Sequence, residues 1–194
     1  MKDSKTILKE VFRKSIHICS SFVPLFLRWN YWFTVYGLLI IVALYYFTEL
    51  ARLEGHPVPV ISFITKTASR KRDECKFVLG PVTLVLGIVF AALVLPLSSA
   101  KVGIFALAFG DGLASLFGKL FGKREIPHTG GKTFAGSITC FAAVFISTFV
   151  VSKNIFTSIV VAVCAMLIEA FPLGDWDNMI IPAFTGLIYH LMMN

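Results

Sequence analysis

Long apolar runs recur along the whole chain, and short polar or charged loops separate them. A membrane-spanning helix needs about 20 mainly apolar residues, or somewhat fewer where the helix is short. By this measure we predict seven helical spans. Their limits are 15–27, 32–48, 81–97, 102–121, 134–151, 155–171 and 179–193. The pattern therefore predicts an all-α fold, a polytopic transmembrane helical bundle in which residues 1–194 form a single membrane-embedded domain.

Composition supports the same class of protein. Of the 194 residues, 57% are hydrophobic and 15% are charged, whereas soluble domains have about 45–50% apolar and about 25% charged residues. A cleaved signal peptide does not explain this excess, because the apolar runs extend over the full length. The net charge is +7, but Lys and Arg gather in a few loops instead of forming a basic stripe. We therefore expect a membrane protein with no nucleic-acid partner.

The distribution of basic residues predicts the orientation of the spans. Lys and Arg concentrate in the cytoplasmic loops of membrane proteins. If the predicted spans alternate in direction, 15 of the 18 basic residues share the side of the N-terminus, and only Arg28, Lys101 and Lys153 lie on the other. The 11 carboxylates also fall on the N-terminal side or at the span ends that face it. We predict a cytoplasmic N-terminus, an outside C-terminus and polar chemistry on the cytoplasmic side.

Asp111 interrupts the fourth apolar run, where an ionisable side chain is costly unless it is paired or hydrated. Small residues follow at four-residue intervals and form a stripe on one helix: Gly110, Ala114, Gly118 and Gly122. The stripe alone favours close packing between helices. Together with Asp111 it favours a functional interpretation, in which a phosphate or a metal ion lies against bare backbone beside the carboxylate.

A glycine-rich loop precedes the fifth apolar run, with Gly130 and Gly131 followed by Lys132 and Thr133. Backbone N–H groups and a helix N-terminus can face an anion there, and Lys132 adds positive charge. The loop lacks the glycine spacing and the preceding strand of a Walker A motif. We interpret it as a phosphate-binding loop of another kind. An ordinary polar loop with a basic membrane anchor fits the same residues equally well.

Carboxylates and an amide gather between the last two apolar runs. Glu169 ends the sixth run, and Asp175, Asp177 and Asn178 follow within ten residues. Hard oxygen ligands of this kind suit Mg²⁺, which keeps several waters and bridges nucleotide phosphates. A solvated acidic loop is the alternative, and it is our interpretation for Asp175.

Two further groups of polar residues lie at the predicted cytoplasmic ends of the first two spans. Arg13 and His17 are four residues apart and therefore share a helical face, with Lys14 beside them. Either a positive anchor or a binding role fits Arg13 and Lys14. Glu49 and Arg52 end the second span and are candidate partners for each other or for this cluster.

Residues 58–77 form a basic amphipathic segment between the second and third runs. Apolar residues occupy its first half, and Arg70, Lys71 and Arg72 follow. We expect this segment to contact anionic lipid headgroups on the cytoplasmic side rather than to take part in chemistry.

Taken together, these motifs resemble those of the CTP-dependent lipid kinases, a group comprising dolichol kinase, phytol kinase and the yeast-type diacylglycerol kinase. The similarity rests on four stretches that cover both ends of the chain and most of its second half. They are Arg13-Lys14-x-x-His17, Gly110-Asp111 with the small-residue stripe, Lys132-Thr133-x-x-Gly136-Ser137, and Glu169 with Asp177-Asn178 and Pro182.

The resemblance implies an enzyme that transfers the γ-phosphate of CTP to the hydroxyl of a membrane lipid alcohol, with Mg²⁺ as cofactor. It implies nucleotide binding by Arg13, Lys14, Gly118, Lys119, Gly131, Lys132 and Thr133. It implies metal binding by Asp111, Glu169, Asp177 and Asn178, and catalytic roles for Asp111, Asp177 and Lys132. His17, Glu49 and Arg52 are further candidates.

Elementary chemistry is compatible with this expectation. Phosphoryl transfer needs the reactants aligned and the phosphate charge neutralised, and it asks for little covalent chemistry from the protein. The acceptor is expected to be an isoprenoid alcohol, such as a polyprenol or phytol, or diacylglycerol. Two other functions fit the residues: a phosphatidate cytidylyltransferase, which makes CDP-diacylglycerol, and a membrane transporter. Each of these functions is compatible with a homo-oligomer.

Overall fold

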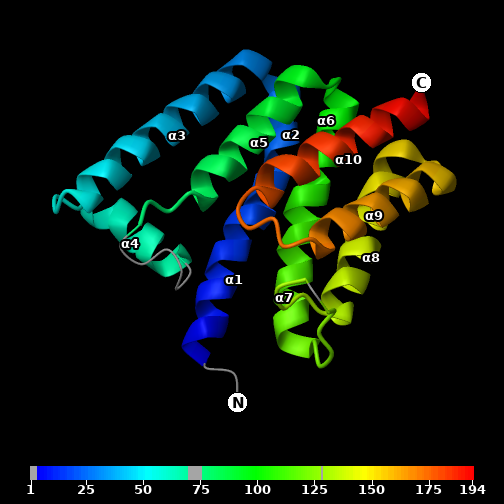
Figure 1. Cartoon of the computed structure of the whole chain (residues 1–194). Helices are drawn as coiled ribbons and strands as arrows, with labels where there is room; N and C mark the ends of the chain where they lie inside the picture. Colours follow the sequence, from blue (N-terminus) through cyan, green and yellow to red (C-terminus); the bar gives the residue numbers. More distant parts are fainter. Residues whose placement is uncertain (1–3, 70–75, 128) are drawn as a thin grey trace.

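The computed structural model describes residues 4–69, 76–127 and 129–194, and within those residues the chain is built from helices and loops (Figure 1). One isolated bridge, between Glu125 and Thr133, joins two loop segments. The predicted all-α class is therefore confirmed for the described residues. The helices are α1 (Ser4–Cys19), α2 (Val23–Trp29), α3 (Tyr31–Leu53), α4 (Pro59–Ala68), α5 (Gly80–Val94), α6 (Leu97–Phe105), α7 (Gly112–Phe121), α8 (Phe134–Ser152), α9 (Ile155–Ala170) and α10 (Asp177–Met193).

Two of the predicted runs are composite in the structure. The first begins within α1, passes through a 3₁₀ turn at Ser20–Phe22 and ends in α2. The fourth joins α6 to α7 through a π-helical segment, η3 (Ala106–Asp111). A π-helical turn inserts an extra residue into the helix and is frequent at functional sites. Asp111 is the last residue of this turn, so the irregularity re-aims its side chain.

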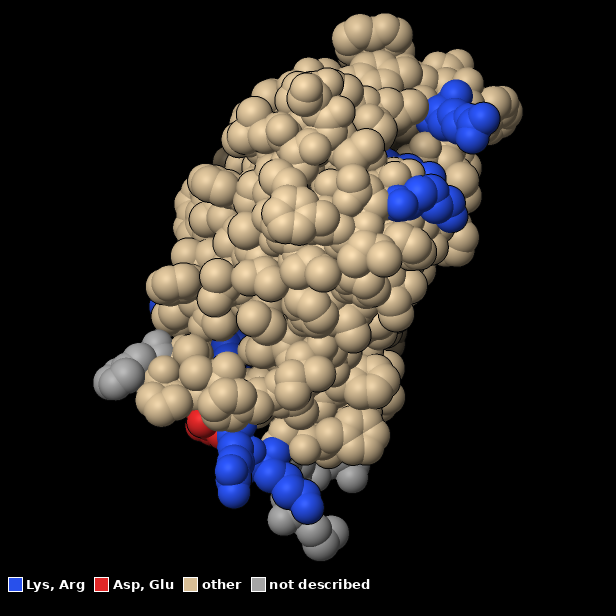
Figure 2. All heavy atoms as spheres, turned by 90° about the vertical axis from the view of Figure 1, so that its right-hand side faces the viewer, with Lys and Arg blue, Asp and Glu red and all other residues tan. Residues whose placement is uncertain are grey.

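Three helices of the described residues are long and apolar enough to cross a membrane. They span Tyr31–Leu53, Leu97–Phe121 and Phe134–Ser152, and the apolar helices Gly80–Val94 and Ile155–Ala170 are shorter. Figure 2 shows a face on which Lys and Arg lie toward its two ends, with a broad area of uncharged side chains between them. Large exposed hydrophobic residues are numerous, among them Phe156 and Leu167 of α9. The chain is therefore a membrane protein.

Helix α10 lies against α5 and α6 along a contact that we call the seam. A Cβ atom added to Gly87 of α5 would lie 2.1 Å from the carbonyl oxygen of Asn178, and one on Gly103 of α6 would lie 2.2 Å from that of Pro182. Gly186 of α10 approaches the carbonyl oxygen of Ser99 in the same way. The helices touch through their backbones, as small residues permit in membrane bundles.

The predicted segment 58–77 contains helix α4, which packs against α1 and α3. Its buried residues are small or polar, namely Ser62, Thr65 and Ala68, whereas Val60 and Phe63 point outward and are about 70% exposed. An outward apolar face agrees with a helix that contacts lipid. Residues 70–72, which supply most of the predicted positive charge, lie outside the described residues.

Candidate active site

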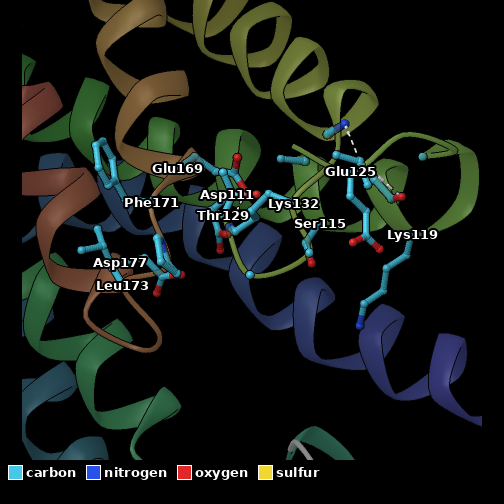
Figure 3. A pocket seen from close by; sticks show the side chains of 18 of the residues that line it. Asp111, Ser115, Lys119, Glu125, Thr129, Lys132, Glu169, Phe171, Leu173 and Asp177 are labelled. Atoms are coloured by element: carbon cyan, nitrogen blue, oxygen red, sulfur yellow. Dashed lines mark hydrogen bonds and ion pairs between the residues drawn. The ribbon is translucent and has the colours of Figure 1, made fainter. Parts of the chain in front are cut away.

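A cavity of about 510 Å³ opens where α1, α7 and the start of α8 meet residues 122–127, 129–133 and 171–177 (Figure 3). Ligand-binding cavities commonly have volumes of about 300–1,000 Å³. Ten of the predicted site residues line it: Arg13, Lys14, Asp111, Gly118, Lys119, Gly131, Lys132, Thr133, Glu169 and Asp177. The structure thus brings residues from both halves of the chain to one place.

The first ion pair of the cavity joins α1 to the π-helical turn. Lys14 donates a hydrogen bond to Oδ2 of Asp111, and both side chains are about 2% exposed. Nδ1 of His17 lies 3.2 Å from the same oxygen. The pairing explains how an ionisable residue is tolerated within a predicted span, because an unpaired charge there would be costly.

A second ion pair connects the glycine-rich loop to the end of α9. Lys132 donates to Oε1 of Glu169, and the other carboxylate oxygen, Oε2, is buried without a hydrogen-bond partner among the described residues. Burial alone would lower the pKa of Lys132, but the carboxylates of Glu169, Asp111 and Asp177 raise that pKa above its usual value. Lys132 therefore keeps its positive charge at neutral pH and faces three carboxylates.

A third cluster lies at the rim of the cavity, and no sequence motif indicated it. Glu10 of α1 is about 3% exposed and accepts hydrogen bonds from Arg13, Lys119 and Ser115. The Arg13 distances are 2.6 and 2.7 Å, and the Ser115 distance is 2.5 Å. Burial would raise the pKa of Glu10, but Arg13 and the hydrogen bonds from Lys119 and Ser115 hold it at about 2. Glu10 fixes two cations that line the cavity.

The small-residue stripe, for which the sequence favoured a functional interpretation, also serves close packing between helices. A Cβ atom on Gly110 would lie 2.7 Å from Val144 of α8, and one on Gly118 would lie 2.9 Å from Oγ1 of Thr133. A Cβ atom on Gly122 would also meet Thr133. The stripe therefore draws α8 and its first turn against α7. Gly118 and Gly122 line the cavity as well, so bare backbone does border it.

The glycine-rich loop is shaped by two residues in the left-handed region. Gly130 has a φ of 67° and Gly131 a φ of 94°, values that side chains other than glycine adopt with strain. The chain then turns into α8, where the Oγ1 atom of Thr133 accepts the N–H of Gly136 as an N-cap. The N-terminus of α8 consequently borders the cavity beside Lys132.

Four predicted site residues lie elsewhere. His17 and Asn178 line a smaller, neighbouring crevice rather than the cavity. Glu49 accepts two hydrogen bonds from Arg52 and one from the N–H of Val78. That pair therefore ties the end of α3 to the approach to α5.

The carboxylates suit a metal ion that arrives with phosphates better than a metal held by protein alone. Among the described residues no group of three or more His, Cys, Asp or Glu side chains is arranged to hold a metal ion. Asp111, Glu169 and Asp177 nevertheless line one cavity, and Oε2 of Glu169 has no partner there. Mg²⁺ commonly uses one or two carboxylates plus nucleotide phosphates, and this donor set fits that pattern. Asn178 lies in the crevice and is not part of the donor set.

Comparison with known proteins finds relatives that are named as kinases of phytol or farnesol. The chain is 30% identical over 188 residues to phytol kinase from Synechocystis sp., a match that covers 92% of this chain and 78% of that protein. The chain belongs to the phytol kinase family. The lipid kinase group predicted from the sequence motifs is thereby confirmed.

Two further relatives are similar over a shorter part of their length. Phytol kinase 1 of Arabidopsis thaliana is 28% identical over 158 residues, covering 72% of this chain and 52% of that protein. Farnesol kinase of the same plant is 29% identical over 140 residues, covering 63% of this chain and 45% of that protein. The chain thus spans about half the length of these chloroplast relatives. No family model matches the chain, and no solved structure matches it.

Proposed function

We propose that this protein is a lipid kinase that transfers the terminal phosphate of a nucleoside triphosphate to the hydroxyl of an isoprenoid alcohol. The observation that carries the proposal is the cavity in which Arg13, Lys14, Lys119 and Lys132 face Asp111, Glu169 and Asp177. Cations in this arrangement suit a triphosphate, and carboxylates suit the metal ion that accompanies it. The similarity to phytol and farnesol kinases supports the choice of acceptor.

The chain's own residues then have distinct tasks. Lys132 and the N-terminus of α8 hold phosphate oxygens, and Lys14, Arg13 and Lys119 add positive charge on the α1 side of the cavity. The alcohol oxygen forms a bond to the γ-phosphorus while the bond to the bridging oxygen breaks and the nucleoside diphosphate leaves. Asp111 or Asp177 accepts the hydroxyl proton.

CTP and Mg²⁺ complete the proposal. When bound, the metal would neutralise charge on the phosphates, and the residues that would hold it are Asp111, Glu169 and Asp177. CTP is the donor that the sequence resemblance implies. Lys132 pairs with Glu169 in the structure, so we expect it to exchange this carboxylate for phosphate oxygens when a nucleotide enters.

The arrangement in the membrane is part of the same proposal. About seven spans, a cytoplasmic N-terminus and an outside C-terminus would bring the cavity to the cytoplasmic side, where nucleotides are available. The concentration of Lys and Arg around the N-terminus and the loop 122–133 supports this orientation. A homo-oligomer is compatible with it.

A cytidylyltransferase acting on phosphatidate is the second candidate, because it too would bind CTP among cations and carboxylates. The relatives do not favour it, since their names refer to kinases of phytol and farnesol. They likewise do not favour a transporter.

The test is a transfer assay with purified protein in detergent. The protein is incubated with Mg²⁺ and γ-labelled CTP, ATP, GTP or UTP in turn, with phytol, farnesol, a longer polyprenol or diacylglycerol as acceptor. We expect label in the isoprenoid alcohols with CTP and loss of that label in Asp111→Asn. Absence of label in every alcohol with every nucleotide would refute the proposal.

A further inference from the structure

A second, smaller crevice of about 40 Å³ lies beside α1, between the ends of α4, α5 and α10. One wall is apolar and includes Ile16, Val78 and Leu84, and the polar end includes His17 and Asn178. This volume is separate from the cavity described above, but Arg13 lines both.

Asp111 lines the cavity, and its contact with His17 connects it to the crevice. Lys14 lines the cavity and His17 lines the crevice, and both approach the same carboxylate oxygen of Asp111. The residues around the start of α10 are divided in the same way, with Asp177 in the cavity and Asp175 in the crevice. A phosphate donor in the cavity and a phosphate acceptor in the crevice would therefore meet at α1, near Arg13 and Asp111.

Asn178 carries a polar atom that lacks a partner. Its side chain is about 3% exposed, and its Nδ2 donates to Oγ1 of Thr83 at 3.0 Å and to the carbonyl oxygen of Gly80 at 3.3 Å. Its Oδ1 is buried and has no hydrogen-bond partner among the described residues. A buried amide oxygen costs free energy unless a donor satisfies it, and a hydroxyl group is such a donor. The two bonds of Nδ2 fix the amide, so Oδ1 is held in place to accept.

We propose that this crevice binds the hydroxyl end of the lipid acceptor, and that it selects a primary alcohol on a single chain. The inference rests on the proposed function. A volume of about 40 Å³ has room for about three water-sized groups. A terminal CH₂–OH and its neighbouring carbon fit that space, and the rest of the chain would follow the apolar wall toward lipid. The hydroxyl of 1,2-diacylglycerol is also primary, but the neighbouring carbon carries an ester branch, which the same space excludes.

The proposal also changes the role of Asn178. The sequence motifs implied a metal ligand, whereas the crevice makes its Oδ1 an acceptor for the alcohol hydroxyl. In this role Asn178 orients the alcohol and does not help to neutralise the charge of the phosphates.

Two glycines provide a matched test. Gly80 lines the crevice and Gly37 lies on α3, and a Cβ atom added to either would meet no atom within 4 Å. Both Gly80→Val and Gly37→Val are therefore expected to fold. Gly80→Val should lower kcat/KM for phytol by about tenfold or more, because added methyl groups in a fitted pocket have effects of this size. The KM for the nucleotide should change by less than about twofold, since the cavity is untouched. Gly37→Val should match the wild type in both.

Photolabelling supplies a measurement independent of any variant. A farnesol analogue with a diazirine near the hydroxyl should label peptides of α1 and of the start of α5 in the wild-type protein, and excess phytol should reduce the label. Equal phytol kinetics in Gly80→Val and Gly37→Val, or label confined to α8 and α9, would overturn the crevice assignment while leaving the kinase proposal standing. Wild-type protein that transfers phosphate to no alcohol would instead refute the proposed function.

Discussion

At the cavity, α1 and α7 are joined through charged side chains, whereas at the seam α10 meets α5 and α6 through bare backbone. Glu10 links Arg13, Lys119 and Ser115 on one side. On the other, Gly87 and Gly103 allow carbonyl oxygens to approach where any Cβ atom would collide. Close backbone packing stabilises a membrane bundle without any ionisable group. Holding helices together in a membrane therefore does not in itself require buried charges such as those at the cavity.

The difference suggests a division of labour. Buried ion pairs cost desolvation, and replacing them by apolar residues is often neutral or stabilising. Among the described residues, three such clusters surround the cavity and none lies along the seam. The costly buried charges therefore lie where phosphate chemistry would use them. Changes at the cavity should then lower activity sharply, whatever their effect on stability, whereas changes at the seam should lower stability and leave activity nearly unchanged.

The largest expected effect comes from Lys132→Met. Removal of the cation that faces Glu169 should lower the rate of phosphate transfer by about 10³-fold, because cations that neutralise a transferring phosphate have effects of this order. The same change leaves Glu169 buried and unpaired, which should destabilise the protein by about 3–5 kcal/mol. Thermal unfolding and transfer rates of the purified variant measure the two effects separately.

A double variant and a surface variant control this prediction. Lys132→Met combined with Glu169→Gln should recover stability without recovering activity, because the unpaired charge is gone but the phosphate ligand is not restored. Lys123→Met, in an exposed position of the same loop, should resemble the wild type. A Lys132→Met protein with a transfer rate within tenfold of the wild type would contradict the assignment.

At the seam, Gly103→Ala should lower stability more than activity. Its Cβ atom would lie 2.2 Å from the carbonyl oxygen of Pro182, so α6 and α10 must separate. We expect a loss of about 1–3 kcal/mol of stability, typical of overpacking, with transfer per folded molecule nearly unchanged. Thermal unfolding in detergent tests this, and Gly37→Ala serves as the control, because its Cβ atom would meet open space. Equal unfolding temperatures for the two variants would show that the seam is not a tight contact.

Glu10→Gln should affect nucleotide binding more than catalysis. Arg13 and Lys119 lose the carboxylate that fixes them, and we expect the KM for the nucleotide to rise by about tenfold with kcat changed little, because a charge-assisted hydrogen bond contributes about 1.5–3 kcal/mol. Glu10→Asp should recover part of the affinity. An unchanged KM in Glu10→Gln would remove the cluster from the nucleotide site.

The same residue gives a dependence on pH. The pKa of Glu10 is lowered from 4.5 to about 2 in the folded protein, so the stability it contributes is present above pH 4.5 and is lost as the pH falls toward 2. Unfolding temperatures measured from pH 6 to pH 3 should therefore fall less steeply in Glu10→Gln than in the wild type. Parallel curves would show that Glu10 is not ion-paired in solution.

The smallest expected effect is that of the α8 N-cap. Thr133→Ala removes the oxygen that accepts the N–H of Gly136 and should cost about 1 kcal/mol. Thr133→Ser retains a capping oxygen and should recover most of the unfolding temperature. If the alanine and serine variants melted at the same temperature, the capping role would be excluded.

The sequence predicted much of the helical framework, because apolar runs and their breaks are local properties. The ends of α8 and α9 lie within two residues of the limits predicted from the pattern. The π-helical turn before Asp111 was not predictable, since it depends on how α6 and α7 pack against their neighbours. The sequence also did not predict that the first run would break at Ser20–Phe22.

The site was predictable where residues of unusual chemistry interrupt apolar runs. Asp111 stood out for that reason, whereas Lys132 stood out because it follows the glycine-rich loop, and both line the cavity. Glu10 did not, because in the sequence it is one charge among the basic residues of the N-terminus. Its partner Lys119 lies 109 residues away. Asn178 was placed with the carboxylates because it follows Asp177 directly, but adjacent residues on a helix point in different directions, and it faces the crevice.

The most direct test of the central claim follows the position of a label in the product. Purified protein is supplied with phytol and phosphatidate together, with Mg²⁺ and with CTP labelled either at the γ- or at the α-phosphate. A lipid alcohol kinase will incorporate the γ-label into phytol and release CDP, with no α-label in the lipid fraction. Incorporation of the α-label into lipid, with release of pyrophosphate, would contradict the account and identify a cytidylyltransferase instead.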